Sequence, residues 1–148
     1  MKLSFIIIAV LLLPLQAEDQ PAKEVRKLLS SHSTLAEFTG ITFQPCRHRT
    51  AQCPNQCTHA RKVASFKIIK YIDYKKPGKY GDGKGSSFRT MVEDQLGNTK
   101  IPAATLIIIN SLKKGDTVRL SWNHDYVTRN RSSFPERTII KLSKVEPK

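Results

Sequence analysis

The sequence predicts a small all-β protein with one short helix. Apolar and polar residues alternate in several segments, and β-branched and aromatic residues are concentrated in the same segments. Glycine- and asparagine-containing turns separate these segments. The chain has 148 residues, which is the size of a single domain and too short for a large two-domain enzyme. The order of elements is strand, strand, strand, helix, strand, strand (β-β-β-α-β-β).

The first 17 residues are expected to be a signal peptide. A basic start is followed by an apolar run at residues 5–15, and Ala17 stands at a plausible cleavage point. A bilayer-spanning helix needs about 20 apolar residues, so this run is too short to be one. No later run is long enough either. We therefore expect an exported protein, periplasmic or extracellular, with no transmembrane segment in the mature chain.

Residues 18–36 are expected to be an N-terminal lead-in and linker, followed by the β-barrel domain at residues 37–148. A short helix in the lead-in would place Leu28 and Leu29 on one face. Residues 30–34 are small and polar, which is typical of a linker.

Each element of the domain follows from its local pattern. Strands are expected at residues 37–44, 61–74, 88–94, 116–128 and 137–145, and a helix is expected at residues 102–112. In the first strand, Phe38 and Phe43 are the expected core residues. The alternation of the second strand loses its phase at Ile69, which predicts a β-bulge. The helix segment contains three consecutive isoleucines and could be a strand, but Pro102 before it and a glycine after it favour a helix.

This order of elements resembles that of the OB-fold, a five-stranded barrel with a helix between its third and fourth strands. The segment at residues 112–120 looks like the helix-to-strand junction that is common in OB domains. The resemblance covers residues 37–146, is one of topology, and identifies no named family. It implies a small five-stranded OB-like barrel; an SH3-like barrel or another small β-roll is the alternative. Fold alone does not assign a function.

Cysteine and histidine residues are concentrated in one loop. The candidate metal ligands there are Cys46, His48, Cys53, Cys57 and His59. Thiolate and imidazole are ligands that Zn²⁺ and copper prefer, so the loop predicts a zinc or copper site. A structural disulfide is the alternative, because an exported chain meets an oxidising compartment and three cysteines allow one bridge. A reactive thiol at Cys57 is a third hypothesis.

His124 is a sixth candidate ligand. It alternates with Trp122 and Tyr126, so these three side chains are expected on one face of a strand. His124 is either a histidine at the edge of the core or a ligand or proton-transfer group that meets the cysteine loop in space. Asp125 points to the opposite face of a regular strand and is therefore a poor partner for His124.

The chain is strongly basic, with 25 Lys+Arg, 12 Asp+Glu and a formal net charge of +13. Nine of the basic residues lie between Arg61 and Arg89, where only two Asp oppose them. Aromatic residues are interleaved with these cations, which favours an anionic polymer held by charge and ring stacking. The alternative is a solvated outer face. The candidate polymer-binding residues are Lys67, Lys70, Tyr71, Lys75, Lys76, Lys79, Lys84 and Arg89.

The loop at residues 78–85 is rich in glycine but departs from the phosphate-binding loop. Gly85 stands where that motif requires Ser or Thr, and a strand follows instead of a helix. We therefore expect a flexible connection.

The sequence favours an exported, non-enzymatic binding protein with a metal ion at the cysteine loop. The alternative is a module that binds an anionic polymer or an envelope partner through a basic face, with the cysteines in a structural disulfide. No catalytic residues are assigned, since neither a C-x-x-C redox pair nor a Ser-His-Asp triad can be assembled.

Overall fold

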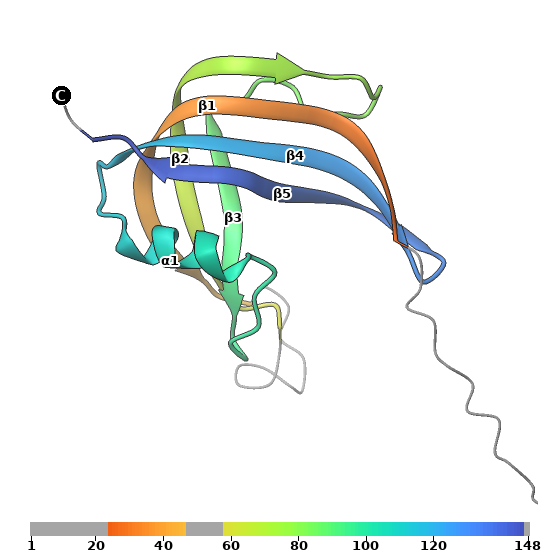
Figure 1. Cartoon of the computed structure of the whole chain (residues 1–148). Coiled ribbons are helices and arrows are strands. Elements are labelled where there is room, and N and C mark those ends of the chain that lie inside the picture. Colours follow the sequence, from red (N-terminus) through yellow and green to blue (C-terminus); the bar gives the residue numbers. More distant parts are fainter. Residues whose placement is uncertain (1–23, 47–57, 147–148) are drawn as a thin grey trace, which may run out of the picture.

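The computed structural model describes residues 24–46 and 58–146 (Figure 1). It contains five strands and one helix, in the predicted order. These are β1 (Val25–Gln44), β2 (Arg61–Lys75), β3 (Ser87–Asp94), α1 (Ala103–Ser111), β4 (Thr117–Arg129) and β5 (Ser132–Lys144). The all-β class with one short helix is therefore confirmed. The expected signal peptide lies outside the described residues.

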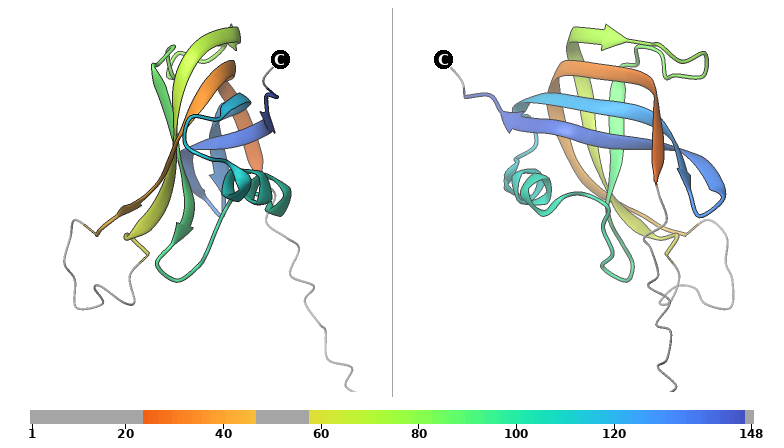
Figure 2. Two further views of the ribbon diagram at one scale, coloured as in Figure 1. Left: turned by 90° about the vertical axis from the view of Figure 1, so that its left-hand side faces the viewer. Right: turned by 45° about the vertical axis from the view of Figure 1, so that its right-hand side comes forward.

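The strands form one antiparallel sheet in the order β3-β2-β1-β4-β5. The sheet is strongly curved, but it is not closed: β3 and β5 are its two edges (Figure 2). The five strands expected for an OB-like barrel are thus present, and the β3 and β5 edges are not hydrogen-bonded to each other. No helix in the described part of the chain is long and apolar enough to cross a membrane.

Strand β1 is much longer than predicted and begins at Val25. The expected lead-in helix and linker at residues 18–36 are therefore wrong for residues 25–36, which lie inside the sheet. The reason is tertiary pairing: Val25–Glu37 pair with β4, and Ser31–Gln44 pair with β2. Ser30, His32 and Thr34 are all buried on the inner face, where a linker would be exposed.

The predicted β-bulge in β2 is confirmed. Leu35 pairs with Lys70 and Ala36 with Ile68, so Ile69 has no partner on β1. A second shift leaves Ile72 unmatched, and its side chain is 52% exposed. Bulges bend a strand and increase its twist, and here they accompany the strong curvature of β1 and β2.

The core lies on the concave face of the sheet and is closed at one end by α1. Phe38, Phe66, Leu120 and Trp122 are buried there, together with Ile109 from the helix. Phe43, which was expected in the core, is 59% exposed. That prediction is wrong because β1 has β4 as a neighbour only as far as Glu37, so its last residues extend beyond the core.

The hairpin between β4 and β5 has a two-residue turn. Asn130 and Arg131 have φ values of 51° and 62°, as in the type I′ turn that matches the twist of a hairpin. Strand β5 consequently begins at Ser132, five residues before the start that alternation predicts at residue 137.

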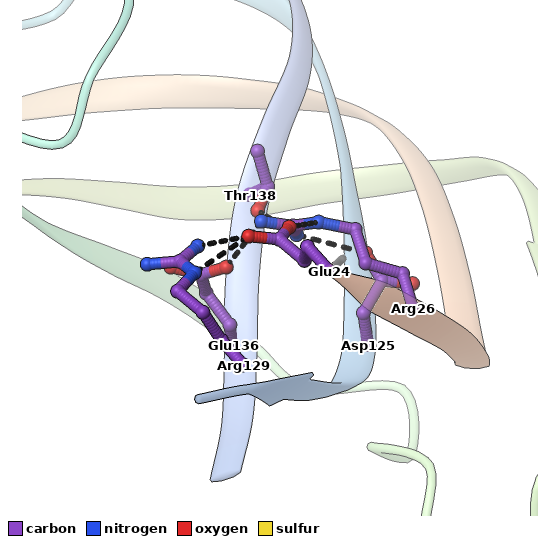
Figure 3. Close-up of polar contacts among 6 residues, drawn as sticks. All are labelled: Glu24, Arg26, Asp125, Arg129, Glu136 and Thr138. Atoms are coloured by element: carbon purple, nitrogen blue, oxygen red, sulfur yellow. Dashed lines mark hydrogen bonds and ion pairs between the residues drawn. The ribbon is translucent and has the colours of Figure 1, made fainter. Parts of the chain in front are cut away.

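A group of ion pairs fastens the start of β1 to this hairpin (Figure 3). Glu24 contacts both Arg26 and Arg129. Arg26 in turn reaches Glu136 at 2.7 Å and Asp125 at 3.6 Å. Exposed pairs contribute little individually, but a network that spans three strands fixes where β1 enters the sheet.

The glycine-rich loop after β2 packs closely on β1, which contradicts the expected flexible connection. Gly78 donates its N–H to the carbonyl oxygen of Leu29 at 3.0 Å. A Cβ atom at Gly78 would lie 2.7 Å from the Leu29 side chain, and one at Gly81 would lie 2.2 Å from the Leu29 carbonyl oxygen. Glycine is therefore required at both positions because the loop lies directly against the backbone of β1.

The packing of this loop can be tested with Gly81→Ala. The added methyl group has to displace the backbone at Leu29, so we expect a loss of about 1–3 kcal/mol in the free energy of unfolding. Urea denaturation measures it. Gly83→Ala is the matched control, because a Cβ there meets no atom within 4 Å and stability should be unchanged or slightly higher. Equal effects of the two substitutions would contradict the packing.

Candidate functional site

The predicted metal loop is only partly within the described residues. His48, Cys53 and Cys57 lie outside them. Cys46 is half-buried just after β1, and His59 is exposed just before β2. Within residues 24–46 and 58–146, no three Asp, Glu, Cys or His side chains are grouped so that they could hold a metal ion.

His124 does not meet the described ends of the cysteine loop, but the rest of that loop, residues 47–57, lies outside the described residues, so its predicted meeting with His124 stays a prediction. The register partner of His124 is Ser30, near the start of β1, whereas Cys46 follows the end of the same strand. Ser30 and Gln44, the last residue of β1, are 14 residues apart, which is roughly 45 Å along the curved strand at the usual rise per residue. The side chain of His124 instead contacts Asp82, in the loop after β2. This loop and the start of β2 lie at opposite sides of the molecule (Figure 1).

Asp82 contacts His124 through both its backbone and its side chain. The Asp82 N–H donates to Nδ1 of His124 at 3.2 Å, and Oδ1 of Asp82 lies 3.3 Å from the same nitrogen. Asp125 is directed elsewhere, toward Arg26. The prediction that Asp125 is a poor partner for His124 is therefore confirmed.

Asp82 also forms a bidentate ion pair with Arg137 of β5. Nε of Arg137 donates to Oδ2 at 2.6 Å and Nη2 donates to Oδ1 at 2.8 Å. Paired N–H donors of this kind give a strong and directional contact. The hydrogen bonds from Arg137 hold the pKa of the Asp82 carboxyl below its usual range, and those to Asp82 raise the pKa of Arg137. The ion pair thus connects the glycine loop to the edge strand β5.

His32 stacks on Trp122 beneath this loop. The two ring centroids are 4.4 Å apart and the planes differ by 6°. Nε2 of His32 is 3.0 Å from Oγ of Ser30, and Nδ1 is buried with no partner among the described residues. Burial lowers the pKa of His32, and the positive charge of Arg137 also lowers it, while the charge of Asp82 opposes the shift.

Two tyrosines of β2 hold the other end of the loop. Tyr71 accepts a hydrogen bond from the N–H of Gly85 at 2.8 Å, and Tyr74 donates to the carbonyl oxygen of Asp82 at 2.9 Å. Nζ of Lys84 lies 5.5 Å from the ring centroids of both tyrosines. Two of the predicted polymer-binding residues, Tyr71 and Lys84, therefore lie against each other. The predicted lysines elsewhere are exposed on β2 and in the loop, at positions 67, 70, 75, 76 and 79.

Three adjoining hollows lie along the gap between the two edges of the sheet, with volumes of 450, 310 and 330 Å³. All three are lined by Arg89 of β3 and Arg137 of β5, and two of them also by Arg61. Lys100 lines the hollow of 310 Å³. We call these connected hollows the arginine groove, defined by Arg61, Arg89, Lys100 and Arg137.

Trp122 and Phe88, at the inner end of the groove, are buried and not available for stacking. Trp122 is buried between the ring of His32 and that of Phe88, whose centroid is 4.5 Å away. The ammonium group of Lys84 lies over the ring of Tyr71. The expectation that interleaved rings in this segment stack on a polymer is therefore wrong for Phe88, because the ring belongs to the core.

Sequence reasoning missed most of the residues that form this site. His32 was assigned to a linker, and Asp82 and Arg137 were given no role. Arg89 was a candidate, but Arg61 and Lys100 were not. The sequence signal that could have found them is one arginine in each of three strands, at positions 61, 89 and 137. Only the sheet topology, however, shows that β3 and β5 face one groove.

Comparisons with known proteins give no match to this chain. No protein-family model, curated protein or solved structure resembles it significantly. The likeness to the OB-fold accordingly stays one of topology, and the functional argument rests on the groove and its surroundings.

The buried His32 predicts a loss of stability between pH 7 and pH 5. Because folding lowers its pKa below the usual value of about 6.5, the unfolded chain binds the proton more readily as the pH falls. The free energy of unfolding should therefore be highest above this range and decrease on acidification. In His32→Phe, which keeps a ring against Trp122, the decrease should be smaller. Urea unfolding at several pH values measures both slopes.

His59→Gln is the control for this experiment, since His59 is exposed. It should retain the slope of the parent protein. Identical slopes in the parent and in His32→Phe would show that His32 does not determine the pH dependence.

Proposed function

We propose that this chain is an exported, non-enzymatic binding protein that holds an anionic polymer in the arginine groove. The observation that carries the proposal is the convergence of Arg61, Arg89 and Arg137 from three different strands on adjoining hollows. Guanidinium groups present several N–H donors in a fixed plane and bind carboxylate, sulfate and phosphate groups in two-point contacts.

The charges in the groove are incompletely balanced by acidic groups of the protein. Arg61, Arg89 and Lys100 form no ion pair with a described residue. The two acidic residues at the groove are already engaged, Asp82 with Arg137 and Glu136 with Arg26. A ligand with regularly spaced anionic groups would supply the missing negative charge.

A polymer fits the shape of the groove better than a single small anion. The hollows adjoin one another and share their arginines, so a chain could contact several cations in succession. The lysines on the outer part of β2 add a long-range attraction that is screened by salt. The groove residues would then fix where the polymer lies.

We predict that Arg89→Gln weakens binding to heparin, used here as a soluble polyanion probe, and that its effect exceeds that of Lys67→Gln. Arg89 lines all three hollows of the groove, whereas Lys67 lines none of them. Affinity should fall steeply with salt concentration for the parent protein, and the salt slope should be shallower in Arg89→Gln. Isothermal titration at several salt concentrations measures these changes.

Two results would count against the groove. One is binding that does not change with salt. The other is an equal loss in Lys67→Gln and Arg89→Gln, which would indicate diffuse attraction to the basic surface.

A second candidate function concerns the cysteine loop, and we propose that it binds zinc or copper. Five Cys and His side chains lie within residues 46–59. Gln44 and Arg61 are register partners, so the two ends of the loop leave neighbouring strands close together. A loop closed in this way could bring several thiolates and imidazoles onto one ion.

For this loop we predict that three thiols react with an alkylating agent when no reductant is added, and that native mass spectrometry of the purified protein shows one bound zinc or copper ion. Mutating Cys57→Ser should remove the ion. A single reactive thiol together with a mass deficit of two hydrogens would indicate a disulfide and overturn the metal proposal.

A further inference from the structure

A fourth hollow lies on the other side of the Asp82–Arg137 ion pair and has a different character. Its volume is 630 Å³, within the range of small-molecule sites. Four structural elements contribute to it: β1, the loop after β2, β4 and β5. We call it the aromatic pocket; the residues used below are Lys27, Leu29, Tyr80, Tyr126, Pro135 and Arg137.

The walls of the aromatic pocket are apolar and its two tyrosines are accessible. Tyr80 is 76% exposed and Tyr126 is 45% exposed, whereas Leu29 is buried beneath them. Pro135 adds an apolar ring from the edge strand. This arrangement differs from the arginine groove, where Trp122 and Phe88 are buried, and it offers exposed ring surfaces to a ligand.

The position of Tyr80 is fixed by its neighbours in the sequence. Gly78 and Gly81 both lie directly against Leu29, and the segment between them is a turn closed by a hydrogen bond from the Gly81 N–H to the Gly78 carbonyl at 3.0 Å. Asp82 follows at once and is held by Arg137. Tyr80 is therefore presented on a well-packed turn despite its large exposed surface.

The aromatic pocket also contains charged and polar groups. Lys27 forms no ion pair with a described residue, whereas Arg137 is paired with Asp82, and both members of that pair line the pocket. Nδ1 of His124 faces Asp82, at 3.2 Å from its N–H and 3.3 Å from its Oδ1. Nε2 of His124 is buried and is therefore not open to a ligand in the pocket. Lys27 is exposed, so it is the cation that can contact an anionic group of a ligand.

We infer that the aromatic pocket binds a small aromatic carboxylate. The ring would lie against Tyr80, Tyr126 and Pro135, because apolar and aromatic surfaces favour a flat apolar group. The carboxylate would lie toward Lys27, because Arg137 is already paired with Asp82. A polyol has too few polar partners on these walls, and a polyanion finds more cations in the arginine groove. The inference is independent of the function proposed for that groove.

The experiment uses 2-naphthoate and its neutral amide as probes, with binding measured by isothermal titration and by shifts of amide resonances. We expect 2-naphthoate to bind, and Tyr80→Ala and Tyr126→Ala each to weaken it by about tenfold. The neutral amide and the Lys27→Gln variant should both show weaker binding, because a charge contact is lost. Phe43→Ala is the matched control: this exposed ring lies at the far end of β1 and its removal should have no effect.

The inference is overturned if 2-naphthoate does not bind at millimolar concentration, if the amide binds equally well, or if the tyrosine variants bind as the parent does. Arg89→Gln separates the two sites. It should reduce heparin binding and leave 2-naphthoate binding unchanged, whereas Tyr80→Ala should do the reverse. Loss of 2-naphthoate binding in Arg89→Gln alone would place the ligand in the groove and would also overturn the inference.

Discussion

Strand β1 is the constraint on which the rest of the structure depends. Residues 31–37 pair with β2 on one side and with β4 on the other, whereas the residues before them pair only with β4 and those after Glu37 only with β2. The two halves of the sheet therefore extend from opposite ends of one long strand. Their outermost strands, β3 and β5, cannot pair along their length, and the arginine groove lies between them.

The Asp82–Arg137 ion pair lies between the arginine groove and the aromatic pocket. Arg137 lines the arginine groove and the aromatic pocket, and Asp82 lines the inner hollow of the groove as well as the pocket. The ion pair also joins a loop to an edge strand that is not adjacent to it in the sheet. A short loop can do this only because two glycines allow it to lie flat on Leu29. The same two glycines therefore determine how the loop packs and where the Asp82–Arg137 ion pair lies in both sites.

The elements with regular patterns could be predicted from sequence. The alternation in β2, β3 and β4 identified these strands, and the loss of phase at Ile69 correctly located a bulge. The first half of β1 could not be predicted, because its small polar residues are typical of loops. In the structure their hydroxyl groups are satisfied across strands: Thr34 donates to the Leu120 carbonyl oxygen, and Ser121 donates to Ser33, each at 3.0 Å. Such partners are far away in the sequence and leave no local signal.

The candidate site was only partly predictable, because its residues are likewise far apart in the sequence. A high density of cations predicted an affinity for anions, but it did not distinguish the lysines of the outer surface from the arginines of the groove. Lysines at positions 67, 70, 75 and 76 are exposed and give a field that salt screens. Arg61, Arg89 and Arg137 belong to three separate strands, and the register of the sheet brings them to one groove. Net charge therefore determines that an anion is attracted, whereas the topology of the sheet determines where it can be held.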